Sequence, residues 1–331
     1  MKKRPPIPAR DSGGAFKLNN PDDGTPIREM FELGDGLFII SEKCTYRIQM
    51  ADQIDPERNN PSLPHNFQQK LFDHGTKSAL LCRTLLQAKV MFRKEFQTID
   101  VRQAMQFSLD ALGNLISMDE ISQRFAASEK AAIDKAQSGE RDASLTVPSV
   151  GNVSAECKSF SQKADHFAVA LMDIVRLFYP DMAKKHWEDF RNLVHAKYGE
   201  EDGFTRLLVQ AAPFLKLIRD TRDCLEHKLE GVKTSDFAPQ ADGTIAPPTI
   251  EVDFRKSVLH RRSISSFMQE VTQAMQVYFE MIVVHICSKS AQPFAGLSLT
   301  VGEVSPESQN AWRVRFGYGS YDQIGRFIPC G

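Results

Sequence analysis

Apolar side chains recur at helical spacing through four segments of residues 153–289, and this pattern constrains the fold more than any other feature of the sequence. Pro180 separates the first segment from the second, and Pro213 lies inside the third, where we expect a kink. The fourth segment, about 263–288, is strongly apolar but carries several glutamine and glutamate side chains. We therefore expect a buried helix there, a helical bundle overall and no membrane span.

Three further helices are expected ahead of this bundle. Residues 66–96 carry phenylalanine, leucine and valine side chains at helical spacing. Asp100 is suited to cap a second helix over about 100–117, and a third helix is expected over about 118–136. Together they predict a helical layer that precedes the bundle.

Short apolar stretches predict strands near both ends of the chain. Residues 36–50 predict a hairpin, and residues 297–304 and 312–317 predict two strands joined by a polar turn. A further strand-like segment, 249–254, interrupts the helical region. We expect these strands to combine in one sheet. The predicted fold class is mostly α, a helical bundle with a small antiparallel β element from the N- and C-terminal segments.

The composition divides the chain into four segments. The first is rich in proline, glycine, aspartate and asparagine, which is typical of a mobile tail. In chain order we expect a flexible N-terminal tail at 1–34, N-terminal strands with a helical layer at 35–150, the helical bundle at 151–290, and a C-terminal β-hairpin at 291–331.

The overall charge gives no sign of a nucleic-acid-binding protein. The chain has 41 Lys and Arg against 42 Asp and Glu, so any such role must depend on a local patch. Its six cysteines include no closely spaced pair, which favours reduced thiols in a cytoplasmic protein. The basic N-terminus lacks the apolar core of a secretory signal. No nucleotide-binding or hydrolase motif is present, and we expect no cofactor and no metal.

Residues 215–229, at the end of the third helical segment, combine an apolar side with a dense group of ionisable side chains. Asp223 and His227 are four residues apart and share one helix face, so the carboxylate is placed to orient the imidazole. Arg222 and His227 are five apart and point roughly 140° away from each other on a straight helix. A second copy of the chain, or a break in the helix, would be needed to bring them together.

This pattern of an arginine, a polar residue, three further residues and a histidine resembles the signature of the HEPN superfamily. The resemblance implies an all-helical bundle, often dimeric, and a metal-independent ribonuclease that leaves a 2′,3′-cyclic phosphate. His227 would be the general base, Arg222 the ligand of the phosphate, and Asp223 the group that orients His227. We assign Arg219 and Lys228 to substrate binding.

Other interpretations of the same residues stay open. Arg222 and His227 could form a solvated helix end, where positive side chains favour the helix dipole. Arg-to-His pairs separated by four to six residues also occur at Arg58 with His65 and at Arg255 with His260, but prolines interrupt the first and the second leaves a strand. His186 and His195 flank large aromatic side chains, and we assign both to packing.

The resulting hypothesis is a HEPN-like, metal-independent endoribonuclease that acts in defence or a stress response, such as toxin–antitoxin systems or phage defence. The expected partners are RNA, a second copy of the chain and a possible protein partner or antitoxin. The alternative is a non-catalytic interaction or RNA-binding module that forms a homodimer.

Overall fold

The computed structural model describes residues 6–11, 24–138, 146–182, 185–294, 298–305, 314–322 and 324–330. The chain divides into two compact units, residues 1–106 with 291–331 and residues 107–290. The structure is 52% helical and 21% strand, and its described strands form four separate sheets of two to four strands. The predicted fold class, a HEPN-like bundle with one small β element, is therefore wrong.

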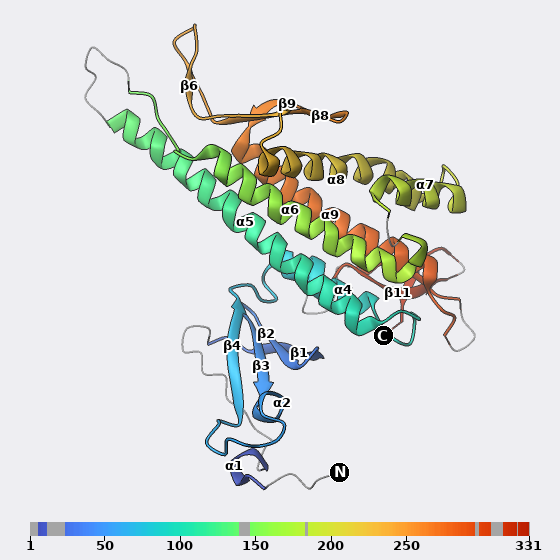
Figure 1. The fold of residues 1–331 in the computed structure, drawn as a ribbon. Coiled ribbons are helices and arrows are strands. Elements are labelled where there is room, and N and C mark those ends of the chain that lie inside the picture. The colour runs from blue at the N-terminus through green and yellow to red at the C-terminus, as the bar shows by residue number, and fades with distance from the viewer. Residues whose placement is uncertain are drawn as a thin grey trace. The chain divides into compact units, whose positions relative to one another are not determined.

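A four-stranded antiparallel meander forms the N-terminal sheet of the first unit (Figure 1). Its strands, each paired with the next, are β1 (Ile27–Leu33), β2 (Gly36–Ser41), β3 (Thr45–Met50) and β4 (Asn66–Phe72). The hairpin predicted over 36–50 is confirmed as β2 and β3. Ile39, Tyr46 and Ile48 meet in a buried cluster, because alternate side chains of a strand point to the same face.

Two expectations for this region are wrong. β1 lies inside the predicted tail, of which residues 1–5 and 12–23 fall outside the described residues. β4 takes up the beginning of the helix predicted over 66–96, since Phe67 and Leu71 are spaced as on a helix but their segment pairs with β3. After β4 the chain passes so close to the β2–β3 turn that no Cβ would fit at Gly75.

Short helices complete the first unit, and one of them anchors a C-terminal sheet. The helices are α1 (Pro8–Asp11), α2 (Ala51–Ile54), α3 (Ala79–Leu81), the π-helix η1 (Cys82–Leu86) and α4 (Gln87–Met91). The sheet contains β10 (Thr300–Glu303), β11 (Phe316–Tyr321) and β12 (Phe327–Pro329). The buried side-chain amide of Gln87 donates to the Phe316 carbonyl at 2.9 Å and accepts from its N–H at 3.1 Å. The Tyr318 hydroxyl donates to the Met91 carbonyl at 2.7 Å.

Long helices dominate the second unit, in which α5, α6 and α9 lie side by side and α8 runs along α6 (Figure 1). The helices are α5 (Val101–Ser138), α6 (Val153–Phe178), the 3₁₀ helix η2 (Pro180–Met182), α7 (Trp187–Tyr198), α8 (Gly203–His227) and α9 (Ile264–Ser290). Aromatic pairs fill the core between α6 and α9, with Phe160 against Phe267 and Phe167 against Phe279. The two helices predicted over 100–117 and 118–136 are one continuous helix, α5.

The strands of the second unit pair locally. β8 (Thr249–Phe254) lies between β5 (Val232–Ser235) and β9 (Ser257–Ser263), while β6 (Ala238–Pro239) pairs with β7 (Ile245–Ala246). The strand predicted over 249–254 is confirmed, but its expected union with the terminal strands in one sheet is wrong. Hairpin neighbours close shorter loops at lower entropic cost, which favours local pairing. None of the described helices combines the length and apolarity needed to cross a membrane.

Candidate functional site

Helix α8 and its cap carry all five side chains that the sequence predicts to be functional. Asp202 caps the start of the helix, because its carboxylate accepts a hydrogen bond from the Phe204 N–H at 2.9 Å. The helix ends after His227, since Lys228 adopts a left-handed conformation with a φ of 51°. The last turns of α8 pack along α6 and against the β8–β9 hairpin, so contacts from both elements determine what each side chain can do.

Three carboxylates surround the Arg222 guanidinium. Its Nε and Nη2 atoms donate to Oδ2 of Asp165 on α6, at 3.1 and 2.8 Å. Its Nη1 atom lies 3.1 Å from an oxygen of Asp223 and 3.3 Å from one of Glu226. Burial lowers the pKa of Arg222, but the hydrogen bond to Asp165 and the three negative charges raise it by more, and the pKa ends above its usual value. The negative excess around this cation disfavours a phosphate.

The structure does not bring Asp223 and His227 into the predicted pair. Asp223 lies between two guanidinium groups, 3.1 Å from Arg222 and 3.5 Å from Arg255. His227 is exposed, and its imidazole forms no hydrogen bond with another described residue. Lys228, beside it, is also exposed. The catalytic roles of Arg222, Asp223 and His227 stay predictions, and no described residue of a single chain links the imidazole to the guanidinium.

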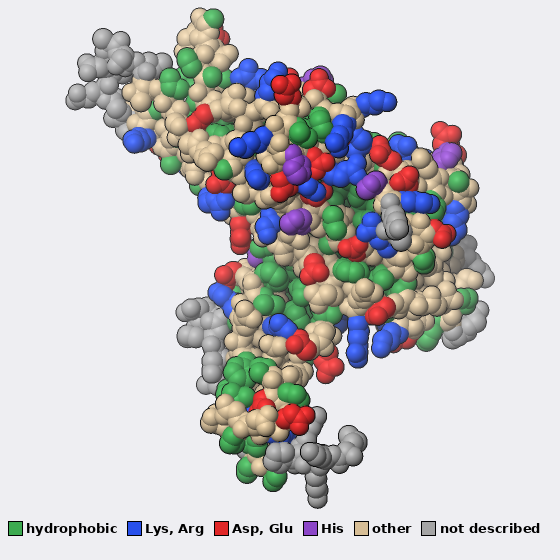
Figure 2. Space-filling model, in the orientation of Figure 1, with side chains coloured by type: hydrophobic (Ala, Val, Ile, Leu, Met, Phe, Trp, Pro, Cys, Tyr) green, Lys and Arg blue, Asp and Glu red, His purple; other side chains and the backbone are tan. Residues whose placement is uncertain are grey.

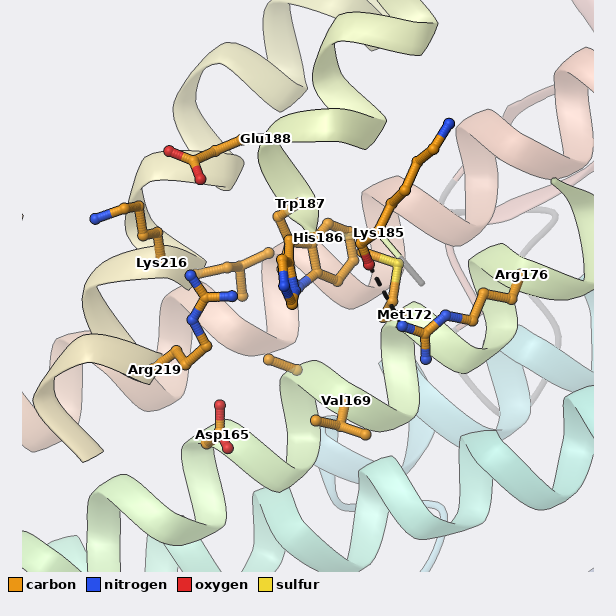
Figure 3. Close-up of a pocket in the computed structure, with 12 residues that line it drawn as sticks. Asp165, Val169, Met172, Arg176, Lys185, His186, Trp187, Glu188, Lys216 and Arg219 are labelled. Carbon is orange, nitrogen blue, oxygen red and sulfur yellow. Dashed lines mark hydrogen bonds between the residues drawn. The ribbon is translucent and has the colours of Figure 1, made fainter. Parts of the chain in front are cut away.

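Arg219 lines a pocket between α6, α8 and the start of α7, with a volume of about 80 Å³. The pocket is lined by Asp165, Ala168, Val169, Met172, Arg176, Lys185, His186, Trp187, Glu188, Leu215, Lys216 and Arg219. Figure 3 shows the Arg219 guanidinium and the His186 imidazole directed into the pocket from α8 and from the residue before α7. Arg219 forms no ion pair with any described residue, so its guanidinium is available to a ligand.

Part of the pocket lining is apolar and buried. Ala168, Met172, Trp187 and Leu215 are all buried, with at most 9% of any of them exposed. Figure 3 shows the amine of Lys185 reaching away from the pocket. The Arg176 guanidinium pairs with Asp173 at 2.6 Å and donates to the Lys185 carbonyl at 3.4 Å, so it holds that loop.

The amine of Lys216, at the pocket edge, is fully occupied by protein acceptors. Its Nζ atom lies 2.6 Å from Asp220, 2.7 Å from the Arg255 carbonyl and 3.1 Å from the Ser257 hydroxyl. Ser257 also donates to the buried Asp220 at 2.6 Å. Three acceptors satisfy the three N–H groups of an ammonium, so this cluster joins α8 to the β8–β9 hairpin and leaves Lys216 no donor for a ligand.

His186 is the residue that sequence reasoning missed. The sequence assigns it to packing, but the structure has it exposed and lining the pocket with Arg219. It stands 33 positions before Arg219 in the chain, and the two meet only because α7 packs on α8. No local spacing in the sequence connects them.

Figure 2 shows basic side chains gathered over α8, with acidic side chains between them. The mixture agrees with the contacts above, in which most cations of α8 already face a carboxylate. Comparison of the chain with protein-family models, with curated proteins and with solved structures gives no match. The function is therefore argued from the side chains alone.

Proposed function

We propose that this protein binds RNA and that Arg219 is its main phosphate contact. The observation that carries the proposal is the difference between Arg219 and its neighbours on α8. Lys216 and Arg222 are each engaged by carboxylates, whereas Arg219 lines a pocket without an ion-pair partner among the described residues. A planar guanidinium with several N–H donors suits the recognition of phosphate oxygens.

Cleavage of the bound RNA is a second proposal, and it rests on the exposure of His227. A free imidazole at a helix end can accept a 2′-hydroxyl proton without rearrangement of the protein. Arg222 would then have to exchange Asp165 for a phosphate, or be supplied by a second chain. The proposal therefore includes a homodimer. It also includes a cytoplasmic location and regulation by a protein partner such as an antitoxin.

RNA binding is tested by fluorescence anisotropy with a labelled single-stranded oligoribonucleotide. We expect Arg219→Ala to weaken binding by roughly tenfold or more, because a charge-assisted hydrogen bond contributes about 1.5–3 kcal/mol. The slope of log affinity against log salt concentration should also become shallower, by the amount expected for the loss of about one phosphate contact. Arg206→Ala is the matched control, since this arginine lies on the same helix with 67% of its side chain exposed. Equal affinities for Arg219→Ala and the native protein would refute the assignment.

Cleavage is tested by incubation of the same RNA with the protein in EDTA. Loss of product with both His227→Ala and Arg222→Ala is the expected result. Arg191→Ala and His195→Ala are matched controls, because this pair on α7 has one residue too few for the motif. Cutting that persists in the first two variants would end the catalytic proposal and leave RNA binding untouched.

A further inference from the structure

We propose that the pocket formed by α6, α7 and α8 binds a terminal phosphate monoester, with Arg219 and His186 as its two direct contacts. The proposal rests on the proposed RNA binding and specifies which part of the RNA the pocket takes. The same chemistry would be presented by a free nucleoside monophosphate.

One side of the pocket is buried and apolar, which favours a chain end over the middle of a strand. The side chains of Ala168, Met172, Trp187 and Leu215 are buried there, so a ligand that enters cannot continue past them. An internal phosphodiester continues on both sides and needs two exits, whereas a monoester has one attachment. A volume of about 80 Å³ is roughly the room of two or three water molecules. That space suits one phosphate group.

The charges that face the pocket favour an anion when the ion pairs of the lining residues are taken into account. Asp165 is the carboxylate that Figure 3 shows on the α6 side, and its Oδ2 atom accepts two hydrogen bonds from Arg222. Glu188 also lines the pocket and opposes an anion. Arg219 forms no ion pair with the part of the chain that the structure describes, so its five N–H groups remain for phosphate oxygens.

The position of His186 adds a second donor from another element. It precedes α7, and its own N–H is capped by the Asp189 carboxylate at 2.9 Å. The backbone of His186 is thereby held at the start of a helix of 12 residues, whose positive end also favours an anion. A phosphate monoester near neutral pH carries about 1.5–2 negative charges, more than the single charge of an internal phosphodiester. The monoester therefore gains more than a phosphodiester from contact with Arg219 and His186.

The experiment compares oligoribonucleotides of one sequence that carry a phosphate at the 5′ end, at the 3′ end or at neither end. A gain of about tenfold in affinity from one of the terminal phosphates is expected. Arg219→Ala and His186→Asn should each remove most of this gain, while Arg206→Ala and His195→Asn keep it. Asparagine preserves the helix-capping ability at position 186.

Calorimetry with adenosine 5′-monophosphate, adenosine and inorganic phosphate separates this inference from RNA binding itself. If the three RNAs bind equally well, the end-recognition inference is overturned while RNA binding stands. If only the monophosphate binds, and Arg219→Ala abolishes it, the pocket is a nucleotide site and the RNA proposal falls. If neither the three RNAs nor the three small probes bind, both are overturned.

Discussion

Arg222 and Asp165 form an ion pair in which two guanidinium N–H groups, at 3.1 and 2.8 Å, converge on one carboxylate oxygen. Asp165 is the more deeply buried partner, with 7% of its side chain exposed against 27% for Arg222. The same carboxylate lines the pocket that holds Arg219. Arg222 therefore neutralises a negative charge at the pocket, a role different from the direct phosphate contact predicted for it.

The first prediction separates these two roles of Arg222. Arg222→Gln leaves Asp165 without its cation, and we expect both weaker phosphate binding and a loss of about 2–4 kcal/mol in the free energy of unfolding. Adding Asp165→Asn removes the uncompensated charge, so the double variant should recover much of both losses. Urea unfolding and RNA anisotropy are measured on the native protein, the two single variants and the double variant, which together form a double-mutant cycle. Binding that stays weak in the double variant would show that Arg222 touches the phosphate itself.

The second prediction concerns the cluster of Lys216, Asp220 and Ser257. Asp220 is fully buried, so removal of its cation in Lys216→Met leaves an unpaired buried charge. We expect a loss of about 3–5 kcal/mol in unfolding free energy, and a loss of about 1 kcal/mol for Ser257→Ala, which removes one hydrogen bond. Lys228→Met, at an exposed position, serves as the control. Similar losses for Lys216→Met and Lys228→Met in urea unfolding would contradict this role.

Local signals in the sequence were sufficient for the long helices α6 and α9 and for the start of α8. Asn152 caps α6 by accepting a hydrogen bond from Ala155, and Asp202 caps α8 in the same manner. The apolar periodicity of the predicted segments 153–179 and 263–288 matches α6 and α9. Periodicity and capping are properties of neighbouring residues, which is why a single sequence reveals them.

Pairing between distant segments was not visible in the same way. The apolar residues of β4 are spaced as on a helix, and only the pairing of this segment with β3 makes it a strand. The pocket depends on α7 packing on α8, which brings His186 to Arg219. Likewise, the sequence shows the carboxylate next to Arg222 but not Asp165, which lies 57 positions away. Side chains from separate elements therefore determine the candidate site.

The third prediction concerns α1, which Arg10 holds to α2 and to the loop that follows it. The buried Arg10 guanidinium donates to Asp52 at 3.2 Å and to Asp55 at 3.1 Å. The hydrogen bond from Arg58, with a further one from Arg10, lowers the pKa of Asp52. Backbone N–H groups and Arg10 lower the pKa of Asp55. A lowered carboxyl pKa gives stability that is present above the unfolded value of about 4 and is lost as pH falls through the folded value.

We therefore expect the attachment of α1 to weaken under acid conditions. The measurement is hydrogen exchange at the Arg10 and Asp11 N–H groups, which bond the Ile7 carbonyl at 2.8 and 2.9 Å. After correction for intrinsic exchange, protection should be high at neutral pH and fall below about pH 4. Arg10→Ala should lack protection at every pH. Protection that is independent of pH in the native protein would disprove the linkage.

The last prediction concerns His285, which stacks on Phe204 with ring centroids 5.1 Å apart. Burial lowers the pKa of His285, and the nearby positive charge of Lys289 acts in the same direction, against the attraction of Asp202. The unfolded chain then binds a proton more readily than the folded one between the lowered value and about 6.5. Folding stability should therefore rise with pH across that window. Urea unfolding at pH 5 and pH 8 measures the rise, and His285→Gln should reduce it. An equal rise in His285→Gln would assign the pH dependence to other groups.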